Sequence, residues 1–377
     1  MTQIPRSEAG PPPPRAGGKR HGPPWWEVLL LGGGLLLFVA LIYAANPAEV
    51  LRQLGDLGWL TVLAVLPYFT AYAADTLGWW WVLTHAFAAG AFRVPSLPRL
   101  FALRASGEAI NGITPTAYLG GEPLKAWLLR RHGVPLAPGL ASALASKTAL
   151  MLTQGLFVFL GVLIAIQAWR PSIPLPLVMG IGLTLMVLVA AAIIAAQRHR
   201  PFTVLLAVSR RWSGRRALLA AWEDDLTALD DMLREFYDRR TGDFLVCCGF
   251  HFTGWTLGSV EVWLLLWLLG APVDFTTAFS IEGLAGVAKL AALIVPASLG
   301  VQEGGQILIF VAFGLGPSRA ITFSLIRRAR ELVWIAFGLA VLWREQAAAR
   351  RERLAPPRRQ ERQGNVNGGE TPSGPVP

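Results

Sequence analysis

The chain has 377 residues, of which 53% are apolar and only 15% are charged, and its formal net charge is +10. A soluble domain carries about 25% charged residues, because its surface has to be covered by them. The composition therefore excludes collagen, a coiled coil and a wholly disordered chain, and it predicts an all-α, polytopic membrane helix bundle. Residues 1–26, with four consecutive prolines and four basic side chains, predict a disordered cytoplasmic tail.

Membrane segments account for most of the chain from 27 to 343. Six apolar stretches are long enough to cross a bilayer: 28–45, 59–84, 137–168, 173–196, 244–269 and 318–343. Two further stretches, 97–132 and 275–316, are apolar but interrupted by proline, glycine and charge. Unpaired backbone in hydrocarbon costs several kcal/mol per group, so such breaks persist only inside protein or beside water. We therefore expect two re-entrant or broken helical segments.

The polar segment 197–243 combines a basic cluster with an apolar stripe. The basic cluster, which we expect to contact anionic lipid of the inner leaflet, is Arg210, Arg211, Arg215 and Arg216. The apolar side chains recur at spacings of four and three: Trp222, Leu226, Leu229, Leu233 and Phe236. This pattern is typical of an amphipathic helix, lying either on the inner leaflet or over the bundle. Residues 344–377 carry seven arginines and are expected to form a second disordered cytoplasmic tail.

Orientation follows from the distribution of Lys and Arg between the loops. Both tails, the 86–99 loop and the 197–243 segment are expected in the cytoplasm, and the remaining short loops on the other side. The tails are not expected to bind nucleic acid, because no folded surface presents their charge as a patch.

The two broken segments match each other at a fixed offset of 181 residues. Three pairs share this offset: Pro115 and Pro296, Glu122 and Glu303, Lys147 and Arg328. The first broken segment is entered from the cytoplasmic side and the second from outside, so the units run upside down relative to each other. Repeat one covers about 59–168 and repeat two about 244–343. Inverted repeats with broken helices near the midplane are the architecture of secondary transporters.

Ionisable residues inside these segments are candidates for function, because insertion costs about 2.5–3.5 kcal/mol each. Glu122 and Glu303 follow glycine-rich breaks, and two readings stay open for them: capping of a new half-helix, or contact with a substrate. Lys147 and Arg328 also have two readings: each snorkels toward a membrane surface, or Lys147 pairs with Glu122 and Arg328 with Glu303. In the second reading each cation becomes a site for an anionic head group once its pair opens. The candidate substrate-binding residues are Asn111, Pro115, Gly120, Gly121, Glu122, Lys147, Pro296, Gly300, Glu303 and Arg328.

Several other residues have simpler interpretations. Asp75 is expected to hydrogen-bond within the bundle, and Glu331 to form a local helix ion pair. Gly254 and Gly258 form a GxxxG step that allows close helix packing and a possible homodimer. The five histidines match no recognisable pairing, and no motif of a nucleotide, metal or hydrolase site is present. We therefore expect neither enzymatic activity nor a cofactor.

Two runs of residues carry a resemblance to a known family. Asn111, Pro115, Gly120, Gly121 and Glu122 with Lys147, and Pro296, Leu299, Gly300 and Glu303 with Arg328, resemble the membrane domain of bacterial lysylphosphatidylglycerol synthases. They resemble equally the stand-alone flippase-like members of that family, over roughly residues 28–343. The resemblance implies a lipid-translocating role. In the two-domain synthases a C-terminal soluble domain transfers the amino acid; this chain ends 34 residues after its last span, so we expect no aminoacyltransferase.

The segment from Asp75 to Trp81, DTLGWWW, is also similar to family members associated with hopanoid biosynthesis. The leading hypothesis is a bacterial inner-membrane transporter of a polar or amphiphilic lipid, with both termini in the cytoplasm. The alternatives are a membrane subunit of a hopanoid or phospholipid biosynthetic system, and a structural scaffold.

Overall fold

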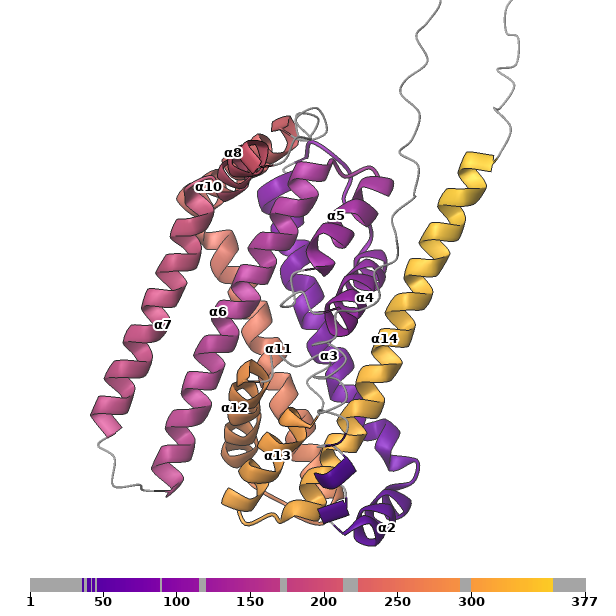
Figure 1. The fold of residues 1–377 in the computed structure, drawn as a ribbon, viewed down its shortest axis with the longest axis vertical. Coiled ribbons are helices and arrows are strands. Elements are labelled where there is room, and N and C mark those ends of the chain that lie inside the picture. Colours follow the sequence, from indigo (N-terminus) through magenta and orange to yellow (C-terminus); the bar gives the residue numbers. More distant parts are fainter. Residues whose placement is uncertain are drawn as a thin grey trace, which may run out of the picture.

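The structure is a computed structural model that describes residues 46–88, 90–114, 120–169, 175–212, 223–291 and 300–354, with 36, 39–41, 43 and 44. All regular elements in these ranges are helices, as the composition predicts (Figure 1). The first half contains α2 (Pro47–Leu57), α3 (Leu60–Trp81), η1 (Val82–Ala88), α4 (Leu97–Ile113), α5 (Gly121–Arg131), α6 (Leu136–Trp169) and α7 (Leu175–Arg198). The second half contains α8 (Pro201–Trp212), α10 (Glu223–Arg239), α11 (Thr241–Leu268), α12 (Phe275–Ala291), α13 (Val301–Ala312) and α14 (Pro317–Leu354).

Five of the six predicted spans coincide with long helices, namely α3 with η1, α6, α7, α11 and α14. The remaining stretch, 28–45, lies mostly outside the described residues. Two helices, Leu136–Gln167 and Ile181–Arg198, are long and apolar enough throughout to cross a membrane by length and composition. The other long helices carry the charges described below. α7 exposes one apolar side chain after another, which suits contact with acyl chains: Ile181, Leu183, Leu185, Val187, Leu188 and Val189.

Each predicted broken segment contains two helices separated by a short stretch. α4 and α5 flank residues 115–119, and α12 and α13 flank residues 292–299. Pro115 and Pro296 therefore lie outside the described residues. α6 and α14 begin 181 residues apart, and α5 and α13 begin 180 apart.

Figure 1 shows α4 and α5 in the upper half of the molecule and α12 and α13 in the lower half. α3 runs upward and α11, packed against it, runs downward. This arrangement supports the inverted repeat, which stays a prediction, as does re-entry of either segment into a bilayer.

The GxxxG step of α11 is used for helix packing within the chain. A Cβ atom added to Gly254 would lie 2.8 Å from the Asp75 carboxylate and 3.2 Å from the Ala71 carbonyl oxygen, both on α3. Gly258 faces Glu282 of α12, at 3.4 Å. These glycines allow α3 and α12 to approach α11, so the motif no longer argues for a homodimer.

The predicted amphipathic helix is α10, and it covers one end of the bundle rather than only a leaflet. Leu229, Leu233 and Phe236 are buried in a cluster with side chains of α6 and α11. The buried Asp230 carboxylate accepts hydrogen bonds from the Phe202 and Thr203 amides, at 3.3 and 2.7 Å, and so caps the start of α8.

Some residues of the 197–243 segment cannot be placed. Arg215, Arg216 and Trp222 lie outside the described residues, and the side chains of Arg210 and Arg211 are not described.

The boundary predicted for the C-terminal tail is wrong by about three helical turns. α14 continues without a break to Leu354, well past the expected start of the tail at 344. Its last turns are held by Glu345, whose carboxylate lies 3.3 Å from Arg99 and 3.6 Å from Arg131. This part of α14 is thus anchored to the bundle by basic side chains that pair with Glu345.

Candidate functional site

Two glycines and an asparagine set the position of the first candidate site. α5 begins at Gly121, whose amide donates a hydrogen bond to the Asn111 side-chain oxygen at 2.7 Å. A Cβ on Gly121 would lie 2.1 Å from the Gly107 carbonyl oxygen, so only glycine permits this approach of α5 to α4. The contact brings Glu122, in the first turn of α5, against α4 and buries it.

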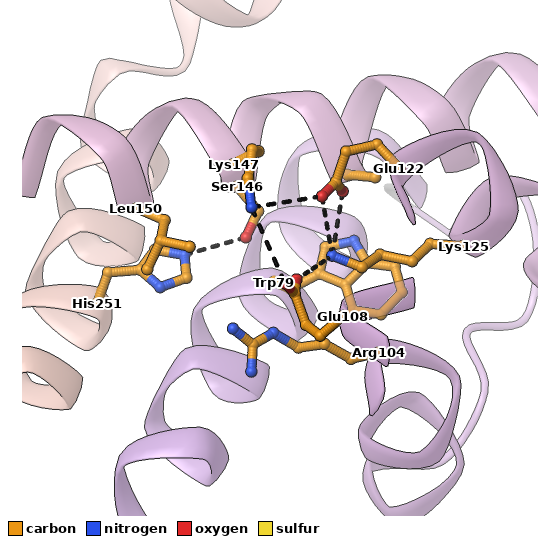
Figure 2. Close-up of a pocket in the computed structure, with 10 residues that line it drawn as sticks. Trp79, Arg104, Glu108, Glu122, Lys125, Ser146, Lys147, Leu150 and His251 are labelled. Atoms are coloured by element: carbon orange, nitrogen blue, oxygen red, sulfur yellow. Dashed lines mark hydrogen bonds and ion pairs between the residues drawn. The ribbon is translucent and has the colours of Figure 1, made fainter. Parts of the chain in front are cut away.

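Two glutamates and two lysines meet in this site, as Figure 2 shows. Lys125 Nζ donates to Glu108 at 2.6 Å and to Glu122 at 3.0 Å. Lys147 Nζ lies 3.8 Å from Glu122 and 3.9 Å from Glu108. The predicted pairing of Lys147 with Glu122 is therefore confirmed as an ion pair. Sequence reasoning missed Lys125, which forms the closer contact.

Lys147 is held differently from Lys125. Its side chain is only 9% exposed, yet among the described residues its ammonium has ion pairs and no hydrogen bond. It borders a cavity of about 10 Å³, room for about one water molecule. The residues around the cavity are Trp79, Arg104, Glu108, Glu122, Lys125, Ala143, Ser146, Lys147, Leu150 and His251. The site is thus polar and small, and within the described part of the chain the Lys147 ammonium is held by ion pairs alone.

A second polar chain adjoins the cavity and joins the two halves of the molecule. The Asp75 carboxylate accepts a hydrogen bond from Arg104 at 2.9 Å, and His251 Nδ1 lies 2.7 Å from it. His251 Nε2 lies 3.0 Å from the Ser146 hydroxyl. Asp75 does hydrogen-bond within the bundle, as predicted. The sequence showed no recognisable pairing for the histidines, and the partners of His251 lie 176 and 105 residues away from it.

The corresponding site of the second half is centred on Glu303. Arg328 Nε donates to Glu303 Oε1 at 2.7 Å, which confirms that predicted pair. The other oxygen of Glu303 accepts from the Gly300 amide at 2.7 Å, at the start of α13. Gly300 has φ +76°, a conformation that favours glycine. The capping interpretation therefore holds for Glu303, together with the ion pair. Glu331 also pairs with Arg328, at 3.0 Å, as predicted.

A further group of buried charges joins α11, α12 and α14. Arg327 contacts Glu282 at 2.7 Å and Glu261 at 3.3 Å, and Arg330 forms an ion pair with Glu261. Arg330 also covers the ring of Tyr68 at 3.7 Å. Glu261 was overlooked, although a lone acid inside an apolar span is itself a signal that a buried cation accompanies it.

The predicted site residues that the structure describes fall into two groups, one in each half of the chain. Gly120 precedes α5 and Gly300 precedes α13, so both mark the start of a half-helix. The structure brings Asn111, Gly121, Glu122 and Lys147 together in the first site. It brings Gly300, Glu303 and Arg328 together in the second.

Most of the chain matches the model of a known family. Residues 25–339 match a family model described as the lysylphosphatidylglycerol synthase TM region. The chain belongs to this family. It is therefore a membrane protein. Its exposed apolar helices suit contact with acyl chains, and its buried charges are paired, as a lipid environment requires. The resemblance read from the two motif runs is confirmed at the level of the family.

One similar member is a UPF0104 membrane protein of Methanothermobacter thermautotrophicus. The two are 25% identical over 252 residues, which cover 63% of this chain and 71% of that protein. No solved structure matches.

Proposed function

We propose that this family member moves a lipid with an anionic head group between the leaflets of the bacterial inner membrane, without aminoacyltransferase activity. The observation that carries the proposal is Lys147, a buried ammonium held by ion pairs at 3.8 and 3.9 Å but by no hydrogen bond among the described residues. A phosphate oxygen can accept hydrogen bonds directly from the Lys147 ammonium. Charge-assisted hydrogen bonds of this kind contribute about 1.5–3 kcal/mol.

The surroundings of Lys147 support a substrate role over a purely structural one. Lys125 donates to both Glu108 and Glu122, and Asn111 donates to Glu108 at 3.2 Å. Lys147 balances the charge of the site but is not needed as a hydrogen-bond donor to the two carboxylates, so its ammonium can donate to a ligand. With room for about one water, the closed site cannot admit a head group, so binding requires α5 and α6 to separate.

The second half supplies a related cation in Arg328, which pairs with Glu303 of α13. Figure 1 shows α13 in the opposite half of the molecule from α5. A lipid crossing the bilayer has to exchange its head group between polar positions at different depths, because an unpaired charge at the bilayer centre is expensive. Two ion-paired sites, one in each half, supply such positions. This accords with the alternating access of inverted-repeat transporters.

The test uses the full chain in phosphatidylcholine vesicles that contain a trace of fluorescent phosphatidylglycerol. A membrane-impermeant reductant bleaches only the outer leaflet, so lipid movement appears as loss of the protected half of the signal. We expect the wild-type chain to move the lipid faster than empty vesicles do. Lys147→Gln is expected to slow this movement about 10-fold or more, because it removes a charge-assisted contact.

Two variants serve as controls. Lys147→Arg keeps the charge and should retain most of the rate. Arg52→Gln removes an exposed cation on α2, outside both sites, and should leave the rate unchanged. A wild-type rate equal to that of empty vesicles contradicts the proposed function. Equal rates for Lys147→Gln and the wild type contradict the site.

A deletion strain separates transport from the alternative role in lipid synthesis. Transport predicts a normal amount of the lipid in the wrong leaflet, whereas a biosynthetic subunit predicts that the product is missing. Leaflet-specific labelling together with total lipid analysis distinguishes these outcomes.

A further inference from the structure

The hydrogen-bonded chain through His251 sits at the junction of the two halves. His251 belongs to α11, Asp75 to α3, and Ser146 to α6, directly before Lys147. α3 and α11 approach closely here, because a Cβ on Gly78 would lie 3.4 Å from His251 Nε2. The imidazole therefore touches both halves and reaches the wall of the cavity that Lys147 borders (Figure 2).

The partners of His251 determine its tautomer when it is neutral. Asp75 is an acceptor that already receives a hydrogen bond from Arg104, so Nδ1 of His251 carries the proton and donates to it. Nε2 is then free of a proton and accepts from the Ser146 hydroxyl. That nitrogen is the one basic position on the ring, and it faces the side of the cavity.

With His251 neutral, the charges of this site balance. The cations are Arg104, Lys125 and Lys147, and the acids are Asp75, Glu108 and Glu122. All six are buried or half-buried in the helix bundle, where net charge is costly. A phosphodiester that enters brings one negative charge. The balance is then restored by one additional proton, and Nε2 of His251, which accepts a hydrogen bond from Ser146 beside the cavity, is a nitrogen that can bind it.

The elements packed against α11 place few other titratable groups near the ring. These groups are Asp75 on α3, Lys147 on α6, Glu282 on α12, Tyr237 on α10 and His85 on η1, with Arg104 of α4 behind Asp75. Glu282 lies at Gly258, about two turns along the helix from His251, and Tyr237 packs on Phe244. Cys247, on α11 itself, is a buried free thiol about one turn before His251. Asp75 and Ser146 are the hydrogen-bond partners of the imidazole among the described residues.

We propose that His251 binds a proton together with the anionic head group, so that the protein takes up lipid phosphate and proton as a pair. The proton is added to Nε2, which then donates to the Ser146 oxygen, while Nδ1 continues to donate to Asp75. No bond other than this N–H is made or broken. The proposal rests on the proposed function, because it concerns the same cavity, and it adds a coupling ion: the proton.

Proton uptake on binding tests this directly. The full chain in a neutral detergent is titrated at pH 7.5 with phosphatidylglycerol, by calorimetry in two buffers of different ionisation enthalpy. The buffer dependence of the heat gives the protons taken up per lipid bound. We expect about one proton per phosphatidylglycerol and none for phosphatidylcholine, whose head group carries no net charge.

Two substitutions assign the proton. His251→Gln is expected to abolish the uptake and weaken phosphatidylglycerol binding. His199→Gln, at an exposed position after α7, should retain both. Because the wild-type measurement stands alone, the proposal remains testable even if His251→Gln does not fold.

The outcomes separate the two proposals. Binding or transport of phosphatidylglycerol without proton uptake overturns the coupling and leaves the transport function standing. Uptake that persists in His251→Gln overturns the assignment to this residue. A chain that neither binds nor moves phosphatidylglycerol overturns the proposed function itself.

Discussion

Arg328 donates to Glu303 at 2.7 Å across the same 25-residue separation at which Lys147 stands 3.8 Å from Glu122. The two pairs are related in sequence but are held with different tightness. Arg328 is additionally held by Glu331 at 3.0 Å and Gln302 at 3.3 Å. The second half thus fixes its cation with hydrogen bonds, whereas Lys147 has only ion pairs to the residues that the structure describes. Under the proposed function, this asymmetry makes the first half the one closer to accepting substrate.

The tight pair predicts a large effect of Glu303→Gln on stability. Glutamine can still accept the Gly300 amide, so the change removes the charge and keeps the cap. Glu303 is 1% exposed, and breaking a buried pair costs about 3–5 kcal/mol, reduced here because Glu331 still holds Arg328. We expect a loss of about 2–3 kcal/mol in the free energy of unfolding, measured by denaturant titration in detergent micelles. Glu331→Gln, at a more exposed site, should cost about 1 kcal/mol or less, and equal losses would contradict this account.

The close approach of α4 and α5 predicts that Gly121→Ala disturbs the first site. The added methyl would meet the Gly107 carbonyl oxygen at 2.1 Å and the Asn111 side chain at 2.9 Å, so α5 has to move outward. Overpacking of this kind costs about 1–3 kcal/mol. We expect lower thermal stability and slower lipid movement.

Gly249→Ala is the matched control for that change. Gly249 lies within α11, and a Cβ there would meet nothing within 4 Å. Alanine favours a helix over glycine by about 0.5–1 kcal/mol, so this variant should be at least as stable as the wild type. A loss of stability in Gly249→Ala equal to that in Gly121→Ala would mean that the close approach is not the cause.

The buried Glu261 predicts a rescue by a second substitution. Glu261→Gln leaves Arg330 without its acidic partner, in a position where both side chains are 5% exposed or less. We expect a loss of about 3–5 kcal/mol and a low yield of folded protein. Adding Arg330→Met removes the unpaired charge, and apolar replacements of buried pairs are often neutral or stabilising. Size-exclusion profiles and thermal unfolding of the single and double variants measure the rescue; a double variant no better than the single one would contradict it.

Local sequence patterns predict much of this architecture, and the reason is physical. Spans such as 137–168 are recognisable because lipid requires long apolar helices, and α6 is one. The pairs Lys147–Glu122 and Arg328–Glu303 are predictable because a buried charge needs a partner, and the shared offset shows which one.

Contacts between distant segments are less accessible to such reasoning. Lys125 reaches Glu108 only because α4 and α5 cross at two glycines, which no local pattern reveals. His251 and Asp75 are brought together by the packing of α11 on α3 across 176 residues. The helical stretch from 344 to 354 was missed because composition alone cannot distinguish a charged helix from a disordered tail.

The loop before α12 predicts a pH-dependent contribution to stability. The Asp274 carboxylate accepts the Thr277 amide at 2.7 Å and so caps this helix outside the membrane-spanning segments. Hydrogen bonds from Thr277 lower the pKa of Asp274 below its ordinary value of 3.8. Because the folded-state pKa is lowered, the contribution is complete above the unfolded pKa and is lost as the pH falls through the folded one. Asp274→Ala should therefore destabilise by about 1 kcal/mol at pH 7.

The same change at low pH is the decisive comparison. Below the folded pKa of Asp274 the wild-type carboxyl is protonated and caps poorly, so the difference between wild type and Asp274→Ala should shrink. Asp274→Asn supplies a pH-independent acceptor and should keep its advantage over alanine at every pH. Thermal unfolding of the three chains in micelles, from pH 7 to pH 3, measures both trends. A constant gap between wild type and Asp274→Ala over that range would show that the carboxylate charge contributes nothing to this cap.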